Sequence, residues 1–171
     1  MILNFQGFMN QNLPFNLEEY QLRLEKVRQS MERQGLELLV ISDPSNMNWL
    51  TGYDGWSFYV HQCVLISQYQ EPIWYGRKQD AAGALRTTYL QEENLWFYPD
   101  HYVQSPERHP MDLLSTRLKE LGWDKLGIGL EMDNYYFSAA AYVSLKSNLS
   151  ETKFVDATGL VNWCRSVKSL K

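Results

Sequence analysis

The chain has 171 residues, of which 44% are hydrophobic and 21% are charged, a balance typical of one globular domain. The net charge is −4, and the lysines and arginines are scattered, which argues against nucleic acid or an anionic membrane as the main partner. No apolar run approaches the ~20 residues that a membrane span needs. Aromatic residues make up 14% of the chain, which favours broad packed surfaces or an interface.

The N-terminal segment and the cysteines bear on where the protein works. Residues 1–15 lack the basic and apolar segments of a secretory signal, so a loose arm is expected there. Cys63 and Cys164 lie far apart in apolar segments and form no CxxC pair. Both are therefore expected to be buried free thiols in a reducing cytoplasm. The globular domain itself is predicted to cover residues 16–160.

Helices and short apolar strands alternate along the chain. The predicted strands cover residues 36–41, 60–67, 73–75, 94–98, 126–130 and 153–155, with a hairpin turn over 68–72. The predicted helices cover residues 16–35, 46–50, 78–90, 110–122 and 135–147, and a last helix opens at 156 or 158. This order predicts an α/β fold with a mixed β-sheet flanked by helices.

Cap residues define where several of these helices begin. Asn16 is the expected N-cap of the first helix, with Glu19 completing a capping box. Ser45 is expected to cap the short helix over 46–50. Either Asp133 or Asn134 is expected to cap the helix over 135–147.

The most informative stretch runs over residues 43–63 and reads DPSNMNWLTGYDGWSFYVHQC. Gly52 and Gly55 loosen the backbone between the first two strands, and large aromatic side chains surround them: Tyr53, Trp56, Phe58 and Tyr59. Four large rings on such a loop cannot all be core, and loops that leave the end of a strand often contact ligands. The alternative for any single ring is that it covers the end of the sheet.

If the second strand begins at residue 60, the alternation of side chains extends back into this loop. Phe58 and Val60 are then expected on one face, and Tyr59 and His61 on the other. One face packs on the domain, and the other, with Trp56, is free to contact a ligand.

Histidines and acidic residues offer few candidates for a metal site. Asp100, His101 and His109 share one predicted loop and could together hold a metal ion, but their spacing matches no zinc-binding pattern. Polar side chains on such a loop are usually exposed to solvent and bind no metal. The sequence therefore predicts no metal ligands.

Candidate nucleophiles and general bases are equally few. His61 and Cys63 share a face of the predicted strand, but the thiol lies in an apolar run where it would be inert. Glu131 and Asp133 could act as an acid–base pair, although helix capping and solvation are the more ordinary roles. The chain contains no GxSxG, P-loop or GxGxxG motif. The sequence thus predicts no catalytic residues.

Several long strings resemble one known family. They are DPSNMNWLTGYDGWSFYVHQCVLI, EPIWYGR, PDHYVQSPERHPMD, GLEMDNYYFSAAAY and VDATGLVNWCRSVKS. Together with the order of elements they resemble the N-terminal domain of the creatinase/prolidase family, the pita-bread hydrolases, over residues 13–169. Within that family, WSFYVHQC and EMDNYYFSAAAY are most similar to the branch that hydrolyses ectoine.

The resemblance implies a two-domain hydrolase whose catalytic pita-bread domain follows this one. Residues 161–171 would then start the linker helix to that second domain. In the family's peptidases the second domain holds two divalent metal ions, whereas creatinase works without metal. The resemblance implies no cofactor in the first domain itself.

The resemblance also implies a homodimer in which the aromatic loop reaches over the partner's active site. The residues expected to contact substrate there are Trp56, Phe58, Tyr59 and His61. In creatinase an arginine follows the matching phenylalanine by two residues, but Val60 stands at that position here, which argues against creatine. The missing cation could come from His61, Arg77 or Arg108.

The expected function is therefore that of a non-catalytic capping and dimerisation domain of a hydrolase. Its substrate would be a small amino-acid derivative, ectoine, cleaved at a C–N bond. The alternatives are the N-terminal domain of an Xaa-Pro dipeptidase or other family peptidase, and a free-standing binding module of the same fold. The chain alone is expected to be inactive.

Overall fold

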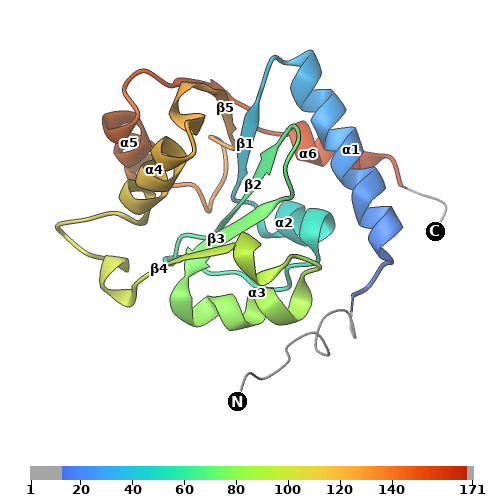
Figure 1. Cartoon of the computed structure of the whole chain (residues 1–171), viewed down its shortest axis with the longest axis horizontal. Helices are drawn as coiled ribbons and strands as arrows, with labels where there is room; N and C mark the ends of the chain where they lie inside the picture. The colour runs from blue at the N-terminus through green and yellow to red at the C-terminus, as the bar shows by residue number, and fades with distance from the viewer. Residues whose placement is uncertain (1–12, 169–171) are drawn as a thin grey trace.

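One mixed sheet organises the computed structural model, which describes residues 13–168 (Figure 1). Its six strands lie in the order β4-β3-β2-β1-β5-β6. Their bounds are Leu38–Ile41 for β1, Cys63–Ser67 for β2, Ile73–Arg77 for β3, Leu95–Tyr98 for β4, Gly127–Leu130 for β5 and Lys153–Asp156 for β6. Strand β2 is antiparallel to β1 and β3, and the other pairs are parallel, so the predicted mixed sheet is confirmed.

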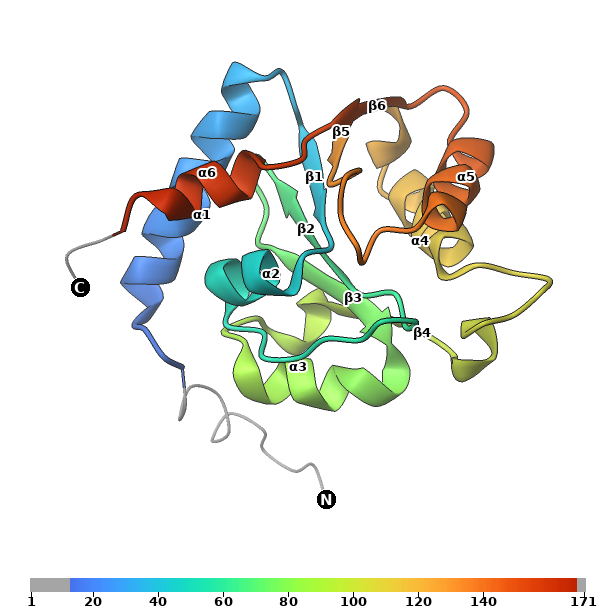
Figure 2. The ribbon, with the colours of Figure 1, turned by 180° about the vertical axis from the view of Figure 1, so that it is seen from behind.

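Helices cover both faces of the sheet. Their bounds are Leu17–Arg33 for α1, Pro44–Thr51 for α2, Ala81–Thr87 for α3, Pro110–Glu120 for α4, Ala139–Asn148 for α5 and Leu160–Ser166 for α6. Figures 1 and 2 show α1, α2 and α6 together on one side and α4 and α5 on the other. The predicted α/β architecture is thus confirmed. None of the helices within residues 13–168 has the length and apolar character to cross a membrane.

The central strand β1 explains why the sheet has two cores. Successive side chains of a strand point to opposite faces. Leu39 and Ile41 accordingly join the core beneath α1 and α2, while Leu38 and Val40 join the core beneath α4 and α5. All four side chains are buried because helices cover both faces of the strand, and this burial requires them all to be apolar.

The helix caps confirm one prediction and correct two. Asn16 caps α1 as predicted, and its side chain accepts the N–H of Glu19, which is one half of the predicted capping box; the Glu19 carboxylate accepts Arg23 at 3.0 Å. Asp43, not Ser45, caps α2, because Pro44 occupies the first helical position and the Asp43 carboxylate reaches the N–H of Asn46 at 3.0 Å.

Helix α5 begins later than the sequence predicts, at Ala139. Its cap is Ser138, whose hydroxyl accepts the N–H of Ala141, and not Asp133 or Asn134. The Asn134 side chain instead accepts the N–H of Tyr136 and turns the chain locally. Residues 135–138 are therefore a loop that carries two tyrosines.

The predicted helix over 78–90 is shorter than expected. Lys78–Asp80 form a 3-10 turn, and α3 ends at Thr87. The hydroxyls of Thr87 and Thr88 donate to backbone carbonyls four residues earlier, a local competition that weakens helices.

The ends of the described chain bear on the predicted domain limits. Most of the predicted N-terminal arm, and residues 169–171 of the predicted linker, lie outside the described residues. Helix α6 packs against α1 and α2, and Leu160 and Val161 are buried in their shared core. Cys63 is a buried free thiol as predicted, whereas Cys164 on α6 is free but only half-buried.

Candidate functional site

The aromatic loop follows α2 and divides its rings between core and surface. Gly52 ends α2 with a positive φ of 84°, a conformation that favours glycine. Tyr53 then turns inward, is 3% exposed, and packs on Trp74 with ring centroids 5.3 Å apart. Trp56, Phe58 and Tyr59 stay outside, each about 60% exposed. The prediction that these rings cannot all be core is therefore confirmed.

The predicted alternation through this loop is wrong. Strand β2 begins at Cys63, and the chain bends before it, where the N–H of Val60 donates to the Ser57 hydroxyl at 3.2 Å. Phe58 is exposed while Val60 is buried, so these two residues do not share a face. The bend interrupts the two-residue period on which the prediction depended.

Phe58 lies at the centre of a surface group of rings. Trp56 meets it edge-on at 4.6 Å, Tyr135 meets it edge-on at 5.6 Å, and Tyr136 stacks on it at 6.3 Å between centroids. We call Trp56, Phe58, Tyr135 and Tyr136 the aromatic cluster. Such edge-to-face and offset arrangements are the favoured contacts of aromatic rings.

Sequence reasoning missed Tyr135 and Tyr136 as site residues because it placed them in a helix. A signal for the loop was present, since Ser138 is as good an N-cap as Asp133 or Asn134 and directly precedes an alanine-rich run. Tyr59, which the sequence grouped with the other rings, is exposed but makes none of the ring contacts of the cluster.

His61 faces the start of α4, not the cluster. Its Nε2 lies 3.0 Å from Nε2 of His109, the N-cap residue of α4. Burial, and then the neighbouring His109, lower the pKa of His61 to about 4. Burial also lowers the pKa of His109, although Asp112 opposes that shift. Both imidazoles are therefore neutral near pH 7.

Glu131 occupies the carboxyl end of β5 and is 3% exposed. It accepts the backbone N–H groups of Ser42 and Asp43 at 2.7 and 2.8 Å, and the side-chain amides of Asn46 and Asn134 at 2.6 and 3.2 Å. Burial raises the pKa of Glu131, and the hydrogen bonds from Asp43, Asn46 and Ser42 partly offset the rise. Its carboxyl group thus joins the end of β1 to the end of β5, a role other than helix capping or solvation.

The second acidic candidate, Asp133, is exposed, and its N–H donates to the Thr158 hydroxyl at 2.9 Å. Asn46 continues the network behind Glu131. Its amide nitrogen also lies 2.8 Å from Oδ1 of Asn162, and its carbonyl oxygen accepts Arg165 at 2.6 Å. The start of α2 is thereby tied to α6.

A crevice of about 200 Å³ opens between these segments. It is lined by Asp43, Glu131, Asp133, Asn134, Tyr135, Tyr136, Thr158, Gly159 and Asn162. Since Tyr136 also stacks on Phe58, the aromatic cluster and the crevice adjoin each other. A second hollow of about 10 Å³, lined by residues that include Ser57 and Tyr136, has room for about one water.

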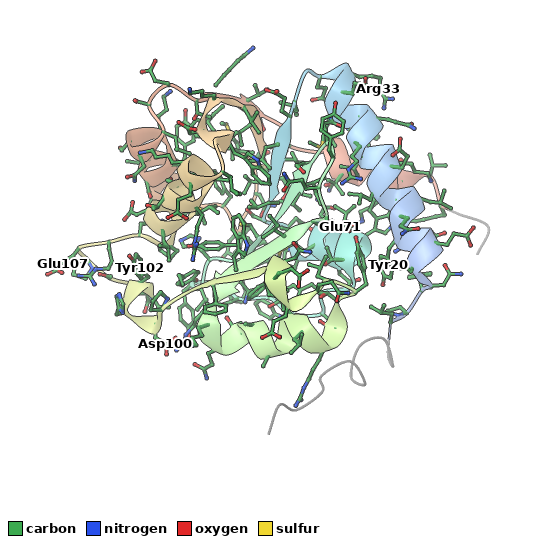
Figure 3. The ribbon with its side chains drawn as sticks, in the orientation of Figure 1. Tyr20, Arg33, Glu71, Asp100, Tyr102 and Glu107 are labelled. Carbon is green, nitrogen blue, oxygen red and sulfur yellow. The ribbon has the colours of Figure 1, made fainter. Side chains whose placement is uncertain are left out.

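The structure separates the residues considered for a metal site. Asp100 accepts Arg77 at 2.8 Å, and His101 lies beside Tyr102, whereas His109 faces His61. Figure 3 shows Asp100 and Tyr102 on the outer loop before α4. Within residues 13–168, no group of three or more His, Cys, Asp or Glu side chains is placed to hold a metal ion.

The candidate nucleophile is buried, and the two candidate arginines are paired with carboxylates away from the aromatic cluster. Burial raises the pKa of the Cys63 thiol, which is fully buried, so this thiol is a poor nucleophile. Arg77 is paired with Asp100, and Arg108 contacts Glu107 at 3.0 Å and lies over the Tyr102 ring. These contacts do not bring either arginine to the aromatic cluster. Val60, at the position of the creatinase arginine, is buried.

Known proteins are similar to this sequence over nearly its whole length. Ectoine hydrolase from Halomonas elongata is 60% identical over 159 residues, which cover 92% of this chain and 40% of that protein. A Sinorhizobium fredii protein described as an uncharacterized hydrolase/peptidase is 40% identical over 158 residues, with the same coverage. The chain thus spans about 40% of the length of these relatives.

The fold of the chain is also similar to that of solved structures. The crystal structure of a proline dipeptidase from Streptococcus pneumoniae superposes with a TM-score of 0.67 at 21% identity, over 85% of this chain and 98% of that one. At this identity the likeness shows the fold alone. The sequence-family model of the creatinase/prolidase N-terminal domain matches residues 23–167, and the chain therefore belongs to this family.

Proposed function

We propose that this chain is the capping and dimerisation domain of a longer hydrolase that cleaves a C–N bond of ectoine. The observation that carries the proposal is the exposed aromatic cluster on segments shared with a 60% identical ectoine hydrolase. The chain spans 40% of that relative, so the catalytic residues are expected in the remainder of a longer protein.

The surface of the cluster supports a role in an assembly. Trp56 and Phe58 are 58% and 61% exposed, and Tyr135 is 80% exposed. Large apolar rings gathered on one part of a surface mark sites that a partner or a ligand covers. We expect them to face the active site of the partner subunit in a homodimer, with the small zwitterionic substrate between.

The proposal includes a domain without a metal cofactor and a location in the cytoplasm. We expect no stoichiometric zinc or manganese on this domain, because Asp100 is engaged by Arg77 and His109 by α4. Metal analysis of the full-length enzyme separates a peptidase-like centre with two divalent ions from a metal-free, creatinase-like one. Two free cysteines are consistent with a reducing cytoplasm.

The test is kinetic and uses the full-length enzyme. Ectoine and Xaa-Pro dipeptides are compared as substrates for the wild type and for the Trp56→Ala, Phe58→Ala and Tyr135→Ala variants, with melting measured in parallel. Tyr69→Ala is the matched control, because Tyr69 is 95% exposed in the turn between β2 and β3. Removing a substrate contact is expected to change KM or kcat by about tenfold without a matching loss of stability.

Three results would contradict the proposal. Turnover of Xaa-Pro dipeptides in preference to ectoine would identify a peptidase. A protein that has no catalytic domain would identify a free-standing binding module. If all three variants lose stability and none alters the kinetics of the folded enzyme, the aromatic loop is structural.

A further inference from the structure

The crevice lies where the connections of the sheet diverge. Strand β1 leads into α2, beneath α1 and α6, whereas its parallel neighbour β5 leads towards α5 on the opposite face (Figure 2). In open α/β sheets, such a divergence at the carboxyl ends of neighbouring parallel strands leaves room for a ligand. Asp43 and Glu131 stand at these two strand ends and line the crevice.

The charged groups of the lining are all carboxyl groups. Asp43, Glu131 and Asp133 contribute three of them, and none of the nine lining residues is Lys, Arg or His. The positive group bonded into this region, Arg165, contacts Asn46 behind Glu131. A concave surface lined by one sign of charge concentrates ligands of the opposite sign. The crevice therefore favours a cation.

Aromatic rings at the same place select the kind of cation. Tyr135 and Tyr136 line the crevice, and Tyr135 is 80% exposed, so its ring is available to a ligand. Planar, delocalised cations are weakly hydrated and bind both to aromatic faces and to carboxylates. A volume of about 200 Å³ suits a small ligand of this kind.

A compact metal ion fits the same lining less well. The carboxylate of Glu131 already accepts four hydrogen bonds, three on Oε2 and one on Oε1, which leaves little capacity to coordinate an ion. One carboxylate oxygen of Asp43 accepts the N–H of Asn46. Hard cations need several free oxygen ligands at short distance.

We propose that this crevice binds a small planar cation, an amidinium or guanidinium group, between the Tyr135 ring and the carboxyl group of Asp133. The choice of an amidinium as the natural ligand rests on the proposed function, because ectoine carries a cyclic amidinium. Asp43 and Glu131 are positioning residues, because their hydrogen bonds fix the ends of β1 and β5 that form the crevice.

The experiment titrates the 171-residue chain with acetamidinium chloride and follows the amide resonances of Asn134 and Asn162 by NMR. Acetamide, which has the same shape without the charge, is the control ligand, and sodium chloride controls for ionic strength. A ligand of four non-hydrogen atoms is expected to bind in the millimolar range. Acetamide is expected to bind at least several-fold more weakly.

Two variants and a matched control locate the site. Asp133→Asn and Tyr135→Leu are each expected to weaken acetamidinium binding by about three- to tenfold. Asp54→Asn makes the same charge change on an exposed residue of the aromatic loop outside the crevice lining, and is expected to leave the affinity unchanged. Equal binding of acetamide, or unchanged affinity in both crevice variants, overturns the proposal.

The outcome is separable from that of the proposed function. If acetamidinium does not bind while the full-length enzyme hydrolyses ectoine and depends on Phe58, the cation site is wrong and the capping role stands. If acetamidinium binds through Asp133 and Tyr135 while the full-length enzyme does not act on ectoine, the cation site stands and the substrate is wrong.

Discussion

The Nε2 atoms of His61 and His109 lie 3.0 Å apart and join the aromatic loop to the first turn of α4. The Nδ1 atom of His109 accepts the N–H of Met111 at 3.1 Å, so this ring carries its hydrogen on Nε2 and donates it to His61. His61 must then accept through Nε2. The contact therefore requires both rings to be neutral.

This requirement predicts that stability falls on acidification. The pKa of His61 drops from 6.5 to about 4 on folding, and that of His109 is also lowered. Between these pH values the unfolded chain binds protons that the folded chain does not. The contribution of these histidines to stability is therefore complete well above pH 6.5 and declines as the pH falls towards 4. We expect a loss on the order of 3 kcal/mol, measured by urea denaturation across this range.

A histidine variant checks the origin of that slope. His61→Gln is expected to flatten the pH dependence between 6.5 and 4. His101→Gln, at an exposed position beside Tyr102, is expected to leave it unchanged. A slope that persists in His61→Gln would show that other groups control the acid sensitivity.

Replacing Glu131 should be among the most destabilising changes in the domain. Glu131→Ala leaves buried donors of Ser42, Asp43 and Asn46 without their acceptor, and we expect a loss of about 2–4 kcal/mol. Glu120→Ala removes an exposed carboxylate paired with Arg117 and should change stability by less than about 0.5 kcal/mol. Equal stability of the two variants in urea would contradict the structural role of Glu131.

Two glycines should respond in opposite directions to the same substitution. A Cβ on Gly129 of β5 would lie 2.9 Å from atoms of Ala157 and Leu36, so Gly129→Ala is expected to lower stability by about 1–3 kcal/mol. A Cβ on Gly83 of α3 meets nothing within 4 Å, so Gly83→Ala should raise stability by about 0.5–1 kcal/mol. Thermal melting of both variants tests the packing around β5.

The 171-residue chain by itself is expected not to hydrolyse ectoine, creatine or Xaa-Pro dipeptides. The nucleophile considered, Cys63, is buried, and Glu131 is occupied by donors. Turnover assays with the purified chain check this. Activity that disappears when one of its own residues is replaced would contradict the expectation.

The order of strands and helices, and hence the fold class, could be read from the sequence. The run at 38–41 is apolar because β1 is covered on both faces, and Asn16 caps α1 by accepting an N–H three residues away. Such features depend on neighbours in the chain, so periodicity and cap chemistry identify them. The errors arose where two local signals competed, as at Asp43 beside Ser45 and at Asn134 before Ser138.

The tertiary structure alone decided which distant residues meet. The sequence singled out Phe58 and His61, but their partners Tyr135, Tyr136 and His109 lie in segments brought alongside by the order of strands in the sheet. The crevice likewise exists because β1 and β5 are parallel neighbours whose connections leave on opposite faces. These contacts depend on side chains far apart in the chain, and local periodicity carries no information about such pairs.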